Sequence, residues 1–284
     1  MSMPDRVCVR GGNPAQGRAS PHFTPAAATR GTLAPPRTGR FRTDVAFFAL
    51  IPAAGSGSRF SQAGAPKQYA PLAGRSMLWH AVRAVCIEPV ETVFVVLAPD
   101  DRRFAEEDWS AFGSRLEPLY CGGGSRRDSV YNGLIATMPV VDADDWVLVH
   151  DAARPCLPAS ALNRLIVSCA GDSVGGILAI PVADTVKRAA KEDAACGGAR
   201  RVGRTEDRSG LWLAQTPQMF RAGTLAEALR RADGPVTDEA GALEAMGLHP
   251  RLVTGSGENL KVTWPEDRAI AESILSARAS GVAT

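Results

Sequence analysis

The sequence predicts an α/β protein built on a single Rossmann-like, mainly parallel sheet with helices on both faces. Two patterns carry this prediction. From residue 44 onward, short apolar runs alternate with segments of helical periodicity. Polar clusters follow several of these runs directly, as ligand-binding loops do at the carboxyl ends of parallel strands. A length of 284 residues fits one large domain of this class or two small ones.

The expected elements of the first half follow one another without long loops. Apolar runs predict strands at 45–51, 92–98, 116–121 and 146–150. Helices are expected after Ser76, which suits an N-cap, and over 100–112, 125–138 and 160–170.

The second half begins with one more apolar strand, 175–182, and then the pattern breaks. Residues 183–216 carry scattered charges and paired glycines, which indicates an excursion from the core, a protruding β-arm. Regular structure resumes with helices at 224–232 and 238–246, a strand at 251–254 and a last helix from Pro265.

Composition narrows the function classes. The formal charge is +2, with 32 Lys and Arg against 30 Asp and Glu, so nucleic acid is not an expected partner. The apolar runs are too short to span a membrane, so no membrane association is expected. The six cysteines form no C-x-x-C pair, which favours buried thiols over disulfides or zinc ligands.

Residues 1–43 differ from the remaining domain, 44–284. They are rich in Arg, Pro, Ala and Gly and poor in acids, and we expect a disordered N-terminal extension. A cytoplasmic protein with such a tail, or with a start codon assigned too early, is the favoured interpretation. Import into a plastid through this segment is the alternative, because transit peptides share its arginine-rich composition.

The segment 47–69, FFALIPAAGSGSRFSQAGAPKQY, predicts a phosphate-binding loop. The small residues 53–55 allow a close approach of the backbone, whose N–H groups bind phosphate oxygens. Arg59 and Lys67 add positive charge. The segment lacks the Gly-Lys-Ser/Thr of the P-loop, and Phe60 stands where the dinucleotide motif has its third glycine. A tight strand-to-helix turn is the alternative for the glycines alone.

Eight segments in a fixed order together resemble one family, the 2-C-methyl-D-erythritol 4-phosphate cytidylyltransferases of non-mevalonate isoprenoid synthesis. The resemblance covers about Val45 to Leu275 and rests on IPAAGSGSRF, PKQY, GGGSRRDSV, VHDAARP, DTVKR, DRSGLWLAQTPQMF, TDEAGALE and NLKVTWPED.

The resemblance implies a nucleotidyltransferase. A phosphate oxygen of methylerythritol phosphate attacks the α-phosphorus of CTP, pyrophosphate leaves, and Mg²⁺ accompanies the triphosphate. By the same resemblance, the residues that stabilise charge or align the acceptor are Arg59, Lys67, Arg208 and Lys261. Contacts to CTP are implied for Pro52, Ala53, Ala54, Gly55, Gly57, Arg59, Lys67, Gly123, Ser129 and Ala152. Contacts to the acceptor are implied for Asp151, Arg154, Thr185, Arg208, Thr216, Thr237 and Lys261, and Asp151 is also the candidate metal ligand.

The resemblance also implies a homodimer formed through the arm, with Arg208 and Thr185 serving the partner's site. Gly124 stands where several relatives carry an acid, which removes one side-chain contact to the nucleotide. His150, beside Asp151, is interpreted as a hydrogen-bonded structural residue.

Three rival functions remain. Cytidylyl transfer to ribitol 5-phosphate shares the CTP half of the site. A nicotinamide oxidoreductase is disfavoured by the failed glycine spacing, and a non-catalytic CTP-binding regulator would bind without turnover.

Overall fold

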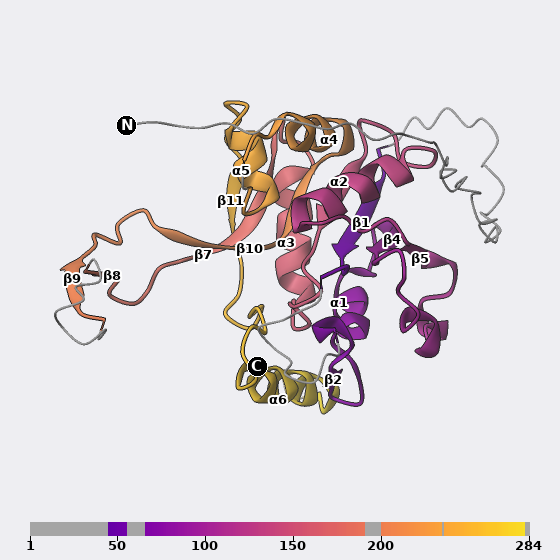
Figure 1. The fold of residues 1–284 in the computed structure, drawn as a ribbon, viewed down its shortest axis with the longest axis horizontal. Helices are drawn as coiled ribbons and strands as arrows, with labels where there is room; N and C mark the ends of the chain where they lie inside the picture. The colour runs from indigo at the N-terminus through magenta and orange to yellow at the C-terminus, as the bar shows by residue number, and fades with distance from the viewer. Residues whose placement is uncertain (1–44, 56–65, 191–199, 235, 282–284) are drawn as a thin grey trace, which may run out of the picture. The chain divides into compact units, whose positions relative to one another are not determined.

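The computed structural model describes residues 45–55, 66–190, 200–234 and 236–281. Its centre is a seven-stranded sheet with the order β11-β7-β10-β6-β1-β4-β5 (Figure 1). The strands are β1 (Phe47–Pro52), β4 (Val90–Val96), β5 (Leu116–Leu119), β6 (Trp146–Val149), β7 (Gly175–Pro181), β10 (Trp212–Arg221) and β11 (Arg251–Thr254). All neighbouring pairs are parallel except the two that β10 makes, which confirms the mainly parallel sheet.

The sequence did not predict β10, and its first residues, Trp212–Thr216, fall inside the range assigned to the arm. The reason is its polar content. Gln215, Thr216 and Gln218 are all buried, although polar side chains on a central strand run against the usual apolar pattern. Because β10 is antiparallel, its N-terminal half lies at the same sheet edge as the carboxyl ends of β6 and β7.

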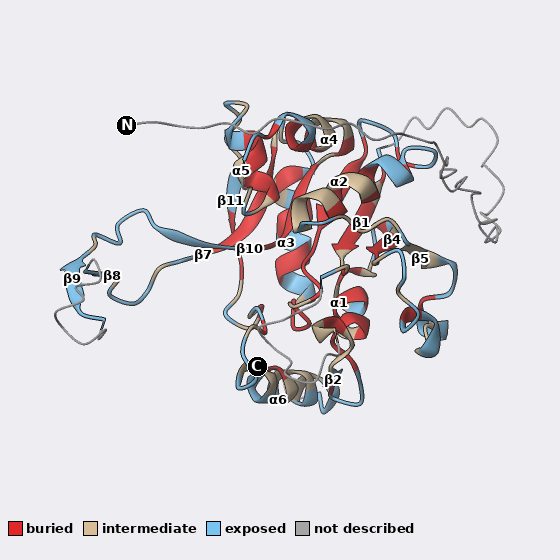
Figure 2. Cartoon of the chain, in the orientation of Figure 1, coloured by how far each residue is buried: buried red, intermediate tan, exposed pale blue. Residues whose placement is uncertain are grey.

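Helices cover both faces of the sheet, as predicted. They are α1 (Met77–Val85), α2 (Arg126–Thr137), α3 (Ala159–Cys169), α4 (Ala222–Arg231), α5 (Glu239–Glu244) and α6 (Asp267–Ala279). Side chains of α1 and α3 pack against one face, and those of α2, α4 and α5 against the other. Figure 2 shows the sheet buried between these layers.

The two cores follow from the alternation of side chains along each strand. On β1, Ala49 and Ile51 point into the α1–α3 layer, whereas Phe48 and Leu50 point into the α2–α4–α5 layer. A third, smaller cluster packs α6 against the hairpin of β2 (Pro71–Leu72) and β3 (Arg75–Ser76).

Two of the predicted helices, the one after Ser76 and the one over 238–246, begin at a capping side chain, and the helix predicted over 100–112 is not formed. Ser76 caps α1 by accepting a hydrogen bond from the Trp79 amide at 3.0 Å, as expected. Asp238 caps α5 in the same way, accepting from Gly241 N at 3.0 Å. The surface helix expected over 100–112 is wrong. The segment holds two 3₁₀ helices, η2 (Phe104–Glu106) and η3 (Ser110–Arg115).

Aspartate side chains explain that difference. Asp101 Oδ1 accepts from the backbone amides of Arg103 and Phe104, and Asp108 Oδ1 accepts from that of Ser110. Such local side-chain bonds compete with the helical hydrogen-bond ladder and favour short turns.

Within the predicted arm, β8 (Lys187–Ala189) and β9 (Val202–Thr205) form an antiparallel pair whose residues are all exposed (Figure 1). Residues 191–199 and the N-terminal extension 1–43 lie outside the described residues. None of the described helices is long and apolar enough to cross a bilayer.

Candidate active site

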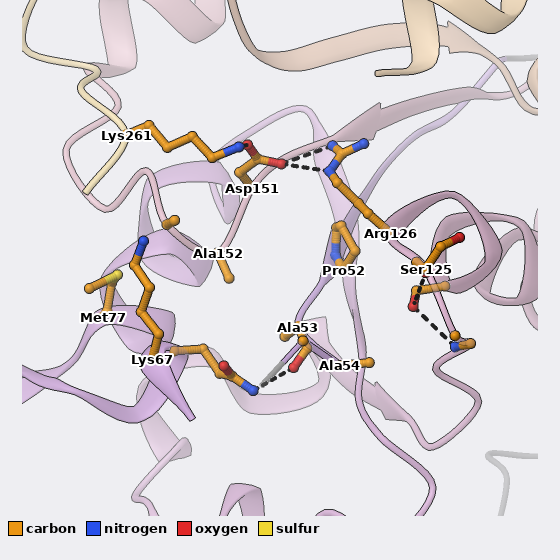
Figure 3. A pocket seen from close by; sticks show the side chains of 16 residues that line it. Pro52, Ala53, Ala54, Lys67, Met77, Ser125, Arg126, Asp151, Ala152 and Lys261 are labelled. Atoms are coloured by element: carbon orange, nitrogen blue, oxygen red, sulfur yellow. Dashed lines mark hydrogen bonds and ion pairs between the residues drawn. The ribbon is translucent and has the colours of Figure 1, made fainter. Parts of the chain in front are cut away.

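A cavity of about 540 Å³ lies where β1, β5 and β6 end (Figure 3). Its walls come from the loops after these strands, the short helix η1 (Lys67–Tyr69), the start of α1 and the segment before α6. The lining residues are Pro52, Ala53, Ala54, Gly55, Lys67, Gln68, Met77, Gly123, Gly124, Ser125, Arg126, Ser129, Asp151, Ala152, Ala153 and Lys261. This is the sheet edge where ligands bind in open α/β folds.

Ala53, the first residue after β1, is held in place through both of its backbone polar groups. The Ala53 amide donates to Val96 O at 2.8 Å, which continues the strand pairing into the loop. The Ala53 carbonyl accepts from the side-chain amide of Gln68 at 2.6 Å. Lys67, from the same short helix, lines the cavity and donates from Nζ to the backbone carbonyl of Val262. The start of the loop is therefore fixed at Ala53, and Lys67 lines the same cavity.

A second loop of small residues, 122–124, follows β5. It packs closely against residues 53–55 because Gly122 has no side chain. A Cβ at Gly122 would lie 2.3 Å from Cβ of Ala54 and 2.7 Å from the Leu97 carbonyl oxygen. In the next turn, Ser129 Oγ accepts from the Gly123 amide at 3.1 Å and donates to Ser125 O at 2.9 Å. A Cβ at Gly124 meets nothing within 4 Å, so packing does not require a glycine at that place.

A smaller cavity of about 230 Å³ adjoins the first. It lies toward β10 and the start of α5, and its lining residues are Arg126, Asp151, Arg154, Ala214, Gln215, Thr216, Gln218, Thr237, Asp238 and Lys261. Three residues line both cavities: Arg126, Asp151 and Lys261. These three side chains therefore form the boundary between the two spaces.

Opposite charges meet at this boundary. Lys261 Nζ lies 2.7 Å from Oδ2 of Asp151, and Arg126 reaches Oδ1 with Nη2 at 2.8 Å and Nε at 2.9 Å. Figure 3 shows the lysine and the arginine approaching the carboxylate from opposite sides. Burial alone raises the pKa of Asp151, but the two cations outweigh it and hold this pKa well below its usual range.

The backbone of Asp151 is fixed through a buried hydrogen-bonded chain. Its amide donates to Thr216 Oγ1 at 2.9 Å, and Thr216 Oγ1 lies 3.1 Å from Nδ1 of His150. His150 Nε2 lies 3.0 Å from the Arg154 carbonyl, so it carries the proton and Nδ1 accepts from Thr216. Burial lowers the pKa of His150 to about 4, which keeps the ring neutral. These contacts confirm that His150 is a hydrogen-bonded residue at the end of a buried strand.

Arg154 was expected to contact the acceptor, and it is one of the residues that line the smaller cavity. Nη1 donates to the Asn259 carbonyl at 2.6 Å, and Nη2 donates to the Ala214 carbonyl at 3.2 Å. The side chain is buried and tied to two backbone segments, which fixes its direction.

The structure brings most of the predicted site residues together. The larger cavity is lined by Pro52, Ala53, Ala54, Gly55, Lys67, Gly123, Ser129 and Ala152. The smaller one is lined by Arg154, Thr216 and Thr237, and both are lined by Asp151 and Lys261. Arg208 and Thr185 are exposed on the arm and line neither cavity of the single chain. Gly57 and Arg59 lie outside the described residues.

Sequence reasoning missed Arg126 and Glu239. Arg126 links Asp151 to Glu239, donating from Nη1 to Oε1 at 2.6 Å and from Nη2 to Oε2 at 3.1 Å. Both residues lie in segments that carried the resemblance, GGGSRRDSV and TDEAGALE. Glu239 falls in the first turn of the helix expected at 238–246, and nothing in its spacing pointed to an arginine more than a hundred positions earlier.

Few of the described side chains around the larger cavity could act as metal ligands. Among the described residues, no group of three or more His, Cys, Asp or Glu side chains is placed to hold a metal ion. Asp151 is the one carboxylate among the described residues that line the larger cavity. A single carboxylate fits Mg²⁺ that is bound mostly by phosphate oxygens and water.

Comparisons with known proteins agree on one family. The family described as 2-C-methyl-D-erythritol 4-phosphate cytidylyltransferase (IspD) matches residues 47–277. A protein of that name from Dechloromonas aromatica is 57% identical over 232 residues, which cover 81% of this chain and 98% of that protein. One of the same name from Nitrosospira multiformis is 54% identical, with 81% of this chain and 97% of that protein covered.

Solved structures give the same answer for the fold. A crystal structure of 4-diphosphocytidyl-2C-methyl-D-erythritol synthase superposes with a TM-score of 0.70 at 40% identity, covering 82% of this chain and all (100%) of that one. The Francisella tularensis cytidylyltransferase superposes with a TM-score of 0.64 at 33% identity, covering 81% and 99%. The chain therefore belongs to the 2-C-methyl-D-erythritol 4-phosphate cytidylyltransferase family, a family of nucleotidyltransferases.

Proposed function

We propose that the protein transfers CMP from CTP to 2-C-methyl-D-erythritol 4-phosphate. The products are 4-diphosphocytidyl-2-C-methyl-D-erythritol and pyrophosphate. The observation that carries the proposal is the pair of adjoining cavities with a shared charged boundary at Arg126, Asp151 and Lys261. Two anionic substrates must meet at one point, and two cavities that share cationic residues provide such a point.

The nucleotide occupies the larger cavity in this proposal. Backbone groups of residues 52–55 face its phosphates, and the Gly123–Ser129 turn faces the base. Lys67 stabilises negative charge that develops on the triphosphate, as a fixed cation does in a water-poor site. Arg59 has the same proposed role on the basis of the family resemblance.

The acceptor occupies the smaller cavity, with its phosphate beside Lys261. An oxygen of that phosphate forms a bond to the α-phosphorus of CTP. The bond from that phosphorus to the oxygen bridging toward the β-phosphate breaks, and this oxygen leaves with pyrophosphate. No proton has to be removed from an ionised phosphate, so no general base is needed. The residues supply position and charge, which suffices for transfer between phosphates.

Mg²⁺ is proposed to accompany the triphosphate and to neutralise part of its charge. Asp151 is the candidate protein ligand, and both of its oxygens already contact cations. The remaining ligands would be phosphate oxygens and water, as is usual for this ion.

The acceptor assay tests the proposal. The purified protein is given CTP and Mg²⁺ with methylerythritol phosphate, with ribitol 5-phosphate, or with no acceptor, and pyrophosphate is measured. Release is expected with methylerythritol phosphate. Release with ribitol 5-phosphate alone would replace the proposed acceptor by the sister substrate, and tight CTP binding without release would favour the non-catalytic regulator.

A homodimer formed through the arm is part of the proposal. The arm and the adjoining start of β10 expose the apolar side chains of Val202, Leu211, Trp212 and Leu213, which suits a surface covered by a second chain. Arg208 lies between them in sequence and is exposed in the single chain. It is proposed to reach the acceptor in the partner's site.

Mixed dimers test this sharing. We expect an Arg208→Ala chain combined with a Lys261→Ala chain to recover about half of the wild-type activity, because one of the two sites then receives both intact residues. Each variant alone should be nearly inactive. The measurement is turnover by dimers purified through two different affinity tags. Mixed dimers as inactive as the parents would show that each site uses its own arginine.

The proposed location is the cytoplasm, because the relatives named above come from bacteria. Import through residues 1–43 is the alternative, and that segment lies outside the described residues.

A further inference from the structure

Glu239 is a buried carboxylate whose position is fixed by the sheet. It is 1% exposed, in the first turn of α5. Gln218 of β10 holds the start of that helix, because its Oε1 accepts from the Ala240 amide and its Nε2 donates to Asp238, both at 2.9 Å. The carboxylate of Glu239 is therefore anchored to a central strand.

Arg126 connects this anchor to the boundary of the two cavities. Two of its nitrogens contact the two oxygens of Glu239, and Nε and Nη2 contact Oδ1 of Asp151. Oδ1 is thereby occupied, and Oδ2 faces Lys261 at 2.7 Å. The four charges form one chain, from α5 through α2 and the loop after β6 to the segment before α6.

Stability alone does not account for such a chain. The two carboxylates are only 1% and 7% exposed, and removing charges from water costs about as much as their pairing returns. Apolar packing would serve the fold equally well. What the ionic chain supplies is direction, because a bidentate arginine–carboxylate contact fixes the plane and the place of both groups.

We infer that Arg126 and Glu239 are positioning residues for the acceptor half of the site. Glu239 fixes the guanidinium of Arg126, which fixes the carboxylate of Asp151, which keeps Lys261 at the boundary where the acceptor phosphate meets CTP. Arg126 lines both cavities, but its Nε, Nη1 and Nη2 donate to the two carboxylates, so it acts on the acceptor through Asp151 and Lys261. The inference rests on the proposed transfer to methylerythritol phosphate. It adds two residues that affect the transfer by holding Asp151 and Lys261 in position.

The test is steady-state kinetics of Arg126→Lys, Glu239→Gln and the double variant, with CTP and methylerythritol phosphate varied separately. Each single change should lower kcat/KM for the acceptor about 10- to 100-fold, because Lys261 is then no longer held at the boundary of the two cavities. The KM for CTP should stay within about twofold, because the contacts of the residues 52–55 loop are untouched. The double variant should be no worse than the worse single one, because Glu239 acts through Arg126.

Matched controls keep the same chemistry on the same helices. Arg127→Lys changes the next residue of α2, which lines neither cavity, and Glu244→Gln changes an exposed acid of α5. Both should leave all kinetic constants unchanged. Thermal unfolding of each protein separates misfolding from misplacement. If Arg126→Lys fails to fold, Glu239→Gln still decides, because it leaves Arg126 and Asp151 paired.

Three results would overturn the inference while wild type and controls turn over normally. They are an equal rise of KM for both substrates, effects that multiply in the double variant, and a loss of thermal stability with unchanged kinetics. If wild type itself forms no product from methylerythritol phosphate, the proposed function falls, and the inference falls with it.

Discussion

Replacing Lys261 with methionine is expected to lower kcat/KM for the acceptor by about 10³-fold, the loss typical of removing one charge-stabilising group. Methionine keeps much of the length of the side chain but removes the charge at the boundary of the two cavities. The folded state should survive, because the lysine side chain is 49% exposed and Arg126 still neutralises Asp151. The measurement is initial rate against methylerythritol phosphate concentration at saturating CTP.

A nearby surface cation serves as the control for Lys261. Arg268 lies in α6, pairs with Glu272 and lines neither cavity, so Arg268→Met should retain wild-type kinetics. Equal losses in the two variants would mean that net charge, and not the position of Lys261, drives the reaction. A Lys261→Met enzyme with normal turnover would remove the acceptor assignment from the smaller cavity.

Replacing Lys67 with alanine is expected to lower kcat by about 10²- to 10³-fold, since the cation acts on charge that develops during transfer. Lys67 lines the larger cavity from the first position of η1, and Pro52, Ala53, Ala54 and Gly55 line the same cavity. The effect should appear in kcat more than in the KM for CTP, because losing an interaction made only in the transition state lowers both kcat and kcat/KM. Single-turnover product formation at saturating CTP measures it.

The control for Lys67 is Arg75→Ala. Arg75 is an exposed cation on β3 that pairs with Asp108 and lies outside both cavities. Its loss should leave kcat unchanged. If a well-folded Lys67→Ala protein turned over at nearly the wild-type rate, the larger cavity would lose its assignment as the triphosphate site.

The sequence predicted the parallel part of the fold well, because those strands follow a simple rule. Runs such as β1 and β4 are buried on both faces and read as continuous apolar segments. β10 follows no such rule, since its buried polar residues serve the site and the α5 anchor. The 100–112 segment failed for a local reason, because its aspartates bond to their own backbone.

The residues of the candidate site also fall into those that a sequence pattern reveals and those that it does not. Residues of the loops after β1, β5 and β6 could be found, because small residues and cations directly after strands have a recognisable chemistry. Arg126 and Glu239 could not, because their function depends on a contact between two helices far apart in the chain. Asp151 was found, but the two cations that hold its carboxylate became visible only in three dimensions.

The measurement closest to the central claim is the ³¹P NMR spectrum of the wild-type reaction with CTP, Mg²⁺ and methylerythritol phosphate. The two adjoining cavities predict that the acceptor monophosphate signal disappears as a diphosphate diester and free pyrophosphate appear in equal amounts. Pyrophosphate accompanied by CMP and unchanged acceptor would contradict the account, because the protein would then hydrolyse CTP without joining the two substrates.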